Sequence, residues 1–163
     1  MRYHIRKAGP ADMSRVLEIY AYARKFMAEH GNPNQWRDTH PKEEQFWEDV
    51  GRGDLYVIED NASIHGVFAF LLGEDPTYSR IYEGSWHYDR PYGTIHRIAG
   101  DGSGGILHAC VVHCEQVIGH LRIDTHHDNI VMQTAVRKDG FRECGISYIA
   151  DGTPRIAYDR LLE

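Results

Sequence analysis

The stretch that decides the fold is Thr94-Ile95-His96-Arg97-Ile98-Ala99-Gly100-Asp101-Gly102-Ser103-Gly104-Gly105. Residues 94–99 predict a β-strand, four glycines follow within six residues, and helical spacing begins at Ile106. A strand that runs through glycines into a helix brings free backbone N–H groups and the positive end of a helix dipole to one point. The stretch therefore predicts a phosphate-binding loop.

An ordinary strand-to-helix turn is the alternative for this loop, but such a turn needs one glycine rather than four. Glycine costs about 0.5–1 kcal/mol of chain entropy where nothing requires it, so the run favours an anion site. The pattern Gly100-x-Gly102-x-x-Gly105, with Asp124 about 20 residues further on, also matches the dinucleotide fingerprint. Against this, too few residues follow Asp124 for two more βα repeats. A Walker loop is excluded because Gly105 is not followed by lysine and serine or threonine.

Length and composition predict one globular domain spanning residues 1–163. The hydrophobic fraction is 42%, the charged fraction is 26%, and no apolar run approaches the ~20 residues of a membrane span. The first residues resemble a strand rather than a secretory signal, so we expect a cytoplasmic protein. The net charge of -6 argues against nucleic acid as a partner.

The cysteines and histidines do not predict a metal site. Three cysteines without a C-x-x-C motif indicate neither a disulfide framework nor a zinc ribbon, and a reducing compartment suits them. Cys110 and Cys114 lie four residues apart on an apolar helical stripe, which predicts buried hydrophobic roles. A zinc site from His126, His127 and Asp128 would lack an evident fourth ligand, and adjacent histidines in such a loop are usually solvated.

The order of elements extends outward from the glycine loop. Residues 3–8 predict a strand, and a long helix carries Val16 to Met27 and stops at Gly31. The other predicted elements are a helix from Pro41 to about Gly51, a hairpin of residues 55–58 and 66–71, an irregular stretch 74–93, a helix 106–118, a strand 121–124, a helix 129–139, and strands 141–149 and 156–161. The sum, β-α-α-β-β-β-α-β-α-β-β, is an α/β (α+β) fold with a mixed sheet and helices on both faces.

At this point the chain resembles the GCN5-related N-acetyltransferases, and the likeness covers nearly its whole length. The strongest local part is the run Leu121 to His126, Asp128-Asn129, Met132-Gln133 and Lys138-Asp139-Gly140-Phe141, which is similar to the family's asparagine, helix and K-x-G-F signature. Residues 32–36 and 76–86 look like those of a bacterial branch whose acceptors are mostly unassigned. The resemblance implies a mostly antiparallel central sheet, an acetyl-CoA donor, no metal, and a homodimer, which is common in this fold.

The resemblance also implies the donor contacts. The pantetheine arm would pair with the strand at Ile98, Ala99 and Gly100. The pyrophosphate would meet the amides of Ser103, Gly104, Gly105, Ile106 and Leu107. Asn129 would hold the arm of the donor, or simply cap a helix. Gly102 and Leu107 stand where the family has a basic and a small residue.

Acetyl transfer to a primary amine needs a base, and His96 lies on the strand next to the implied acyl position. A structural role for His96 remains the alternative. Val136 occupies the place of the family's tyrosine acid, so Cys144, Tyr148 or a bound water would have to replace it. Asp124 and His126 flank the same end of the sheet and are left unassigned, because a carboxylate there more often accepts hydrogen bonds in a loop.

The acceptor is expected to be the amine of a small molecule or peptide. Trp36, Tyr78 and Trp86 are candidate acceptor-binding residues, with Tyr82 and Tyr88 beside them, although an aromatic residue in a long loop often only anchors that loop. Two other functions stay open: a CoA-binding module without catalysis, which would explain Val136 and the atypical loop, and an NAD(P)-binding oxidoreductase, which would explain the fingerprint.

Overall fold

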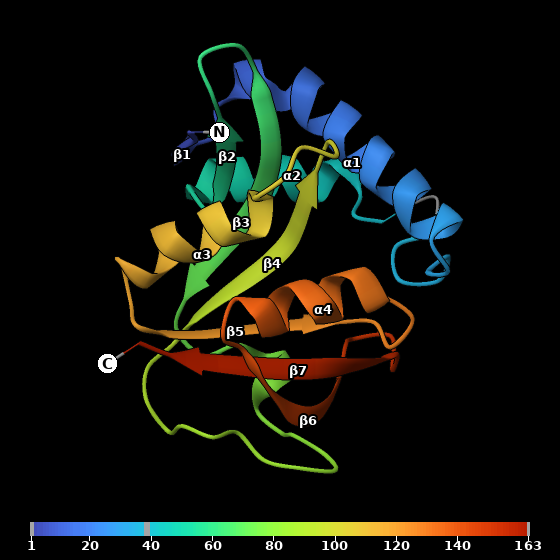
Figure 1. Cartoon of the computed structure of the whole chain (residues 1–163), viewed down its shortest axis with the longest axis vertical. Helices are drawn as coiled ribbons and strands as arrows, with labels where there is room; N and C mark the ends of the chain where they lie inside the picture. Colours follow the sequence, from blue (N-terminus) through green and yellow to red (C-terminus); the bar gives the residue numbers. More distant parts are fainter. Residues whose placement is uncertain (1, 38–39, 163) are drawn as a thin grey trace.

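The computed structural model describes residues 2–37 and 40–162, shown in Figure 1. Its elements are β1 His4–Lys7, a 3-10 turn Pro10–Asp12, α1 Met13–Glu29, α2 Glu43–Arg52, β2 Leu55–Glu59, β3 Ile64–Leu72, a 3-10 turn Pro76–Tyr78, β4 Gly93–Gly100, α3 Ile106–Glu115, β5 His120–Thr125, α4 Ile130–Lys138, β6 Arg142–Tyr148 and β7 Pro154–Leu161. The predicted order of helices and strands is confirmed. The predicted helix 106–118 ends early, because the amides of residues 116–118 turn back to the carbonyls of His113 and Cys114.

The described strands form one sheet in the order β1-β2-β3-β4-β5-β7-β6. Neighbouring strands pair antiparallel everywhere except between β4 and β5. The mixed, mostly antiparallel sheet is therefore confirmed. A dinucleotide-binding domain requires a parallel, doubly wound sheet, so that interpretation of the glycine fingerprint is wrong.

Helices cover both faces of the sheet, and Figure 1 shows α3 and α4 in front of the strands and α2 behind them. Each face has its own apolar core. One core joins α3 and α4 to the sheet and includes Cys110 and Cys114, both fully buried as free thiols, which confirms their predicted hydrophobic role. The other joins α1 and α2 to the strands through Tyr20 and Phe46, whose rings stack at 4.1 Å.

The two central strands separate part-way along their length. β4 and β5 pair only at Gly93 with Leu121 and at Thr94 with Arg122. Beyond these pairs the strands diverge, as Figure 1 shows, so from residue 95 onward no described strand pairs with this backbone edge of β4. An unpaired strand edge presents N–H and C=O groups to whatever lies next to it.

A bulge interrupts β4 at the same place. Val67 pairs with Ala99, but Ala69 pairs with His96, so β4 carries an extra residue. Arg97 has a φ of 52°, in the left-handed region that few residues other than glycine adopt. The hydroxyl of Tyr20 donates to the Arg97 carbonyl at 2.6 Å, and the Arg97 guanidinium makes two hydrogen bonds of 3.0 Å to Asp49 of α2. The bulge is thus held by both helices of that face.

The irregular stretch 74–93 packs over the part of the sheet that α1 and α2 do not cover. Tyr82 makes an isolated bridge to Ile146 of β6, and His87 donates from its backbone to Asp159 of β7. Among the described helices, none combines the length and the apolar character needed to cross a bilayer.

Candidate active site

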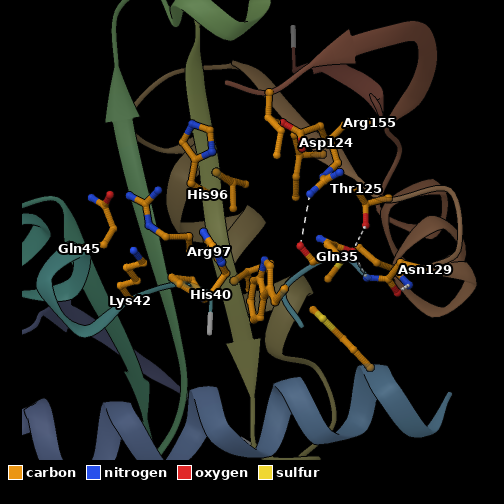
Figure 2. A pocket seen from close by; sticks show the side chains of 18 of the residues that line it. Gln35, His40, Lys42, Gln45, His96, Arg97, Asp124, Thr125, Asn129 and Arg155 are labelled. Atoms are coloured by element: carbon orange, nitrogen blue, oxygen red, sulfur yellow. Dashed lines mark hydrogen bonds between the residues drawn. The ribbon is translucent and has the colours of Figure 1, made fainter. Parts of the chain in front are cut away.

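A cavity of about 530 Å³ opens where β4 and β5 diverge. We call it the wide cavity. Its walls are the bulged part of β4, the end of β5, the loop before α2, and the start of β7, and Figure 2 shows side chains from all four converging on it. A crevice between the ends of two sheet strands is a common place for a ligand.

A second cavity of about 190 Å³, the narrow cavity, runs along β4 towards the glycine loop. Seven of the nine predicted donor-binding residues line it, together with residues of α1 and α4, whereas Gly104 and Gly105 line a different cavity. The two cavities share Met27, Ile98, Asn129 and Met132. They therefore meet beside the bulge. The narrow cavity reaches the glycine loop, and His96 lies in the wall of the wide cavity.

The glycine loop has the backbone geometry of an anion site. Gly105 caps α3 with a φ of 79°, and the first helical hydrogen bond runs from Ala109 to the Gly105 carbonyl. The amides of Ile106 and Leu107 precede that bond and are free to bind an anion. A side chain at Gly104 would meet no atom within 4 Å, so open space lies beside it. Ser103 differs from the prediction, because its amide already donates to Asp101 at 3.0 Å.

An acidic residue lies in this loop, and two basic side chains neutralise it. Asp101 Oδ2 accepts hydrogen bonds from Arg15 at 2.9 Å and from His65 at 2.8 Å. The hydrogen bond to Asp101, with a second one to Asp60, raises the pKa of His65. Arg15 and His65 come from α1 and β3, so the cations near the loop are supplied by distant elements rather than by the loop itself. The sequence pattern carried no signal for this arrangement.

His96 lines the wide cavity, and Asp75 holds its ring. His96 Nε2 lies 2.7 Å from Asp75 Oδ2, while Asp75 Oδ1 accepts from the Thr77 amide at 2.9 Å. The hydrogen bond from His96 lowers the pKa of Asp75. With Asp75 as acceptor, the neutral ring carries its proton on Nε2, which leaves Nδ1 to accept another. The sequence carries no signal for Asp75, because nothing in the local pattern links it to a residue 21 positions away.

The capping role considered for Asn129 is confirmed, and its place beside both cavities leaves the donor-binding role as a prediction. Its side chain caps α4 by accepting from the Met132 amide at 3.1 Å, and the residue lines both cavities. Its amide also donates to Gln35 Oε1 at 3.1 Å, and Thr125 donates to the same oxygen at 3.4 Å. Gln35 therefore attaches the loop before α2 to the end of β5 and the start of α4.

The three aromatic candidates for acceptor binding lie apart. Trp36 lines the wide cavity, 5.7 Å from the ring of Tyr20. Tyr78 is only 2% exposed, and its hydroxyl donates a hydrogen bond to Asp124 at 2.5 Å. It therefore supports a residue of the cavity wall from behind and does not line the wide cavity itself. Trp86 covers the Arg122 guanidinium at 3.8 Å and lines a different cavity. Tyr78 and Trp86 thus anchor the 74–93 stretch, and only Trp36 is placed to touch an acceptor in the wide cavity.

The two side chains considered as proton donors, Cys144 and Tyr148, do not line the wide cavity. Val136 is fully buried in the core between α4 and the sheet. Cys144 lies beside His87, and burial raises its pKa to about 12. Tyr148 packs against Tyr82 at the edge of β6. A water in the cavity is the remaining candidate from the sequence.

His126, His127 and Asp128 have ligand atoms within 4.8 Å of one another. His126 is only 4% exposed, so the expectation of solvated histidines is wrong for this residue. Its Nδ1 accepts from the Asp128 amide at 3.1 Å, and burial lowers the pKa of the ring. These contacts give His126 a structural role at the end of β5.

Comparison with known proteins gives structural but not sequence-profile matches. No protein-family profile matches the chain, and no curated protein matches it in sequence. A GNAT-family acetyltransferase from Streptococcus agalactiae superimposes with a TM-score of 0.87 at 28% identity, covering 99% of this chain and 96% of that one. GNAT-family acetyltransferases from Listeria monocytogenes and Bacillus cereus have TM-scores of 0.69 and 0.64 at 16% and 15% identity. They cover 98% and 100% of this chain, and 95% and 100% of their own chains.

Proposed function

Because the chain belongs to the GCN5-related N-acetyltransferase family, we propose that it transfers an acetyl group from acetyl-CoA to a primary amine. The observation that carries the proposal is the meeting of the two cavities beside the unpaired edge of β4. The narrow cavity suits the part of the donor that runs from the pantetheine arm to the pyrophosphate. The wide cavity leaves room for an acceptor beside His96.

The residues of the narrow cavity fit acetyl-CoA by three features. The free edge of β4 at Ile98 and Ala99 can pair with the amide groups of a pantetheine arm, as an added strand would. The amides of Ile106 and Leu107 stand at the start of α3 without an earlier helical turn to accept them, and both residues line the narrow cavity. Asn129 lines the junction of the cavities, where the arm would pass.

Acetyl-CoA, when bound, supplies the thioester carbonyl that the amine attacks. His96 would take a proton from the ammonium form of the acceptor at Nδ1, with Asp75 stabilising the charged ring. Backbone N–H groups at the bulge would stabilise the negative charge that develops on the carbonyl oxygen. The second amine proton would reach the departing thiolate through water, because the alternative side-chain donors lie outside the wide cavity. No metal takes part in this scheme.

A purified protein offered acetyl-CoA and a panel of primary amines, with free thiol release as the readout, tests the proposal. We expect turnover with some amines, and a fall of about 10²–10⁴-fold in kcat for His96→Gln with acetyl-CoA binding retained. His4→Gln, an exposed histidine on β1, is the matched control and should keep full activity. Thermal stabilisation by acetyl-CoA without any turnover would instead identify a CoA-binding module. Stabilisation by NAD(P) but not by CoA would refute the proposal.

A further inference from the structure

Arg155 is a buried cation that has no carboxylate partner among the described residues. It is only 6% exposed, and its hydrogen bonds go to the carbonyls of Pro154 at 3.0 Å and Gln35 at 3.4 Å. Within residues 2–37 and 40–162, no Asp or Glu oxygen lies within 4.0 Å of its guanidinium. Burial lowers the pKa of Arg155, while Asp124 and Asp151 act on it only from a distance. A buried charge in this condition favours an external anion.

Asp124 is the opposite charge at the same end of the cavity. Asp124 pairs with Ala157 across β5 and β7, so its side chain and that of Arg155 lie on one face of the sheet, in diagonal positions. Both residues line the wide cavity, and Figure 2 shows them together at one end of it. Asp124 accepts a hydrogen bond from Tyr78 and has no cation within 4.0 Å in the described part of the chain.

The other internal charges of the cavity are already paired. Arg97 is bound to Asp49 at 2.9 Å, and His96 to Asp75 at 2.7 Å. Lys42, Glu44 and Glu48 belong to the exposed rim at α2. Arg155 does not line the narrow cavity, so the donor's phosphates are not its partner. Of the described residues, one cation and one anion remain at the inner end, Arg155 and Asp124, more than 4.0 Å apart and both in the cavity wall.

We propose that the acceptor is a small zwitterion, an amine that carries an anionic oxygen group, as amino acids and aminoalkyl phosphates do. Arg155 binds the anionic group through two N–H donors, a geometry that guanidinium groups favour. Asp124 attracts the ammonium to the wall that carries His96. This inference rests on the proposed acetyl transfer and defines its substrate class.

The chemistry of the reaction also fits Asp124 in this role. His96 removes one proton from the ammonium, the nitrogen forms the bond to the acetyl carbon, and the bond from carbon to sulfur breaks. The second amine proton leaves with the thiolate. The product is a neutral amide with its anionic group unchanged, so it keeps the contact with Arg155 and loses the attraction to Asp124. Asp124 therefore favours the substrate over the product.

The experiment compares matched acceptors on the purified protein. The twenty common amino acids are assayed beside their carboxamides, and phosphoethanolamine beside ethanolamine, with wild type, Arg155→Gln, Arg155→Lys and Arg137→Gln. Arg137 is the control because it is 55% exposed and pairs with Glu143 outside the cavity. Urea unfolding of each variant identifies any that fail to fold.

We expect the best acceptor to carry a carboxylate or phosphate and its uncharged counterpart to have a kcat/KM at least about 10-fold lower. Arg155→Gln should remove that preference, Arg155→Lys should restore part of it, and Arg137→Gln should leave it unchanged. The two acceptor series tell a carboxylate from a phosphate. Equal kcat/KM values for charged and uncharged acceptors, or a preference that survives Arg155→Gln, would overturn the inference and leave acetyl transfer standing.

If none of the acceptors is turned over, the preference for an anionic group is measured by binding instead. Calorimetry with N-acetyl amino acids and their amides, at saturating CoA, then measures the preference for the anionic group directly. Tighter binding of the acids in wild type but not in Arg155→Gln would support the zwitterion site while acetyl transfer fails. Binding without any difference between acids and amides would overturn the inference.

Discussion

The ion pair between Arg97 and Asp49 should hold the β4 bulge in place, and removing either charge should destabilise the protein. Asp49 is 1% exposed and the Arg97 side chain 21% exposed, so each variant leaves one charge in a poorly solvated place. Breaking a buried pair costs about 3–5 kcal/mol. We expect about 3 kcal/mol for Asp49→Ala, which leaves the more solvated arginine, and about 5 kcal/mol for Arg97→Met, which leaves the buried carboxylate.

The double variant separates the pair from the individual side chains. Asp49→Ala with Arg97→Met leaves no unpaired charge, so its loss should be about 2 kcal/mol, well below the sum of the single losses. Urea unfolding followed by circular dichroism gives the free energies of unfolding of wild type, the two single variants and the double variant. The affinity for acetyl-CoA reports whether the bulge keeps its shape in each of them. Glu143→Ala, which removes an ion pair exposed on both sides, should cost less than about 1 kcal/mol. Losses that add within about 0.5 kcal/mol would refute a coupled pair.

Three further predictions concern the glycine loop and the thiols. Gly104→Ala should change the free energy of unfolding by less than about 0.5 kcal/mol, because the added methyl group meets no atom within 4 Å. The same variant should weaken acetyl-CoA binding in calorimetry by about 10-fold or more. Unchanged affinity would remove this residue from the phosphate site. The raised pKa of His65 means that its protonated form stabilises the fold below pH ~6.5 and that this contribution is lost as the pH rises through the folded-state pKa. Urea midpoints should therefore decline over that range in wild type and less so in His65→Gln, and parallel curves would contradict the assignment. Burial raises the pKa of Cys110 and Cys144, so a thiol reagent should label the folded protein slowly and the urea-unfolded protein at once, whereas rapid labelling of the folded protein would show an exposed thiolate.

The order of elements could be predicted because it depends on local patterns. Hydrophobic spacing, glycines and prolines place each helix and strand, and the run from Gly140 to Phe141 closes α4 as expected. The glycine loop could be interpreted in the same way, since backbone N–H groups bind an anion whatever the side chains are. The bulge could not be predicted. Arg97 adopts a positive φ only because Tyr20 and Asp49, far away in the sequence, hold it there.

The acceptor side of the site could not be predicted from the sequence, for a related reason. Asp75 meets His96 only because the 74–93 stretch folds back over the sheet. The sequence places Asp124 at the end of a strand, but only the structure shows that none of the described cations pairs with it. Tyr78 and Trp86 were chosen for their residue type, and packing placed them behind the wall or beside another cavity.

The two proposed ligands should be recognised in different ways. The proposed donor site is built mainly of backbone groups, which survive most substitutions, so we expect donor binding to depend on the backbone of β4 and the glycine loop rather than on particular side chains. The acceptor site is built of side chains from β4, β5, β7 and two loops, and Gln35 ties one of those loops to Asn129 and to Arg155. A change in any of these side chains can alter acceptor choice without touching the donor. Acceptor specificity should therefore be sought at Asp124 and Arg155 rather than in the glycine loop.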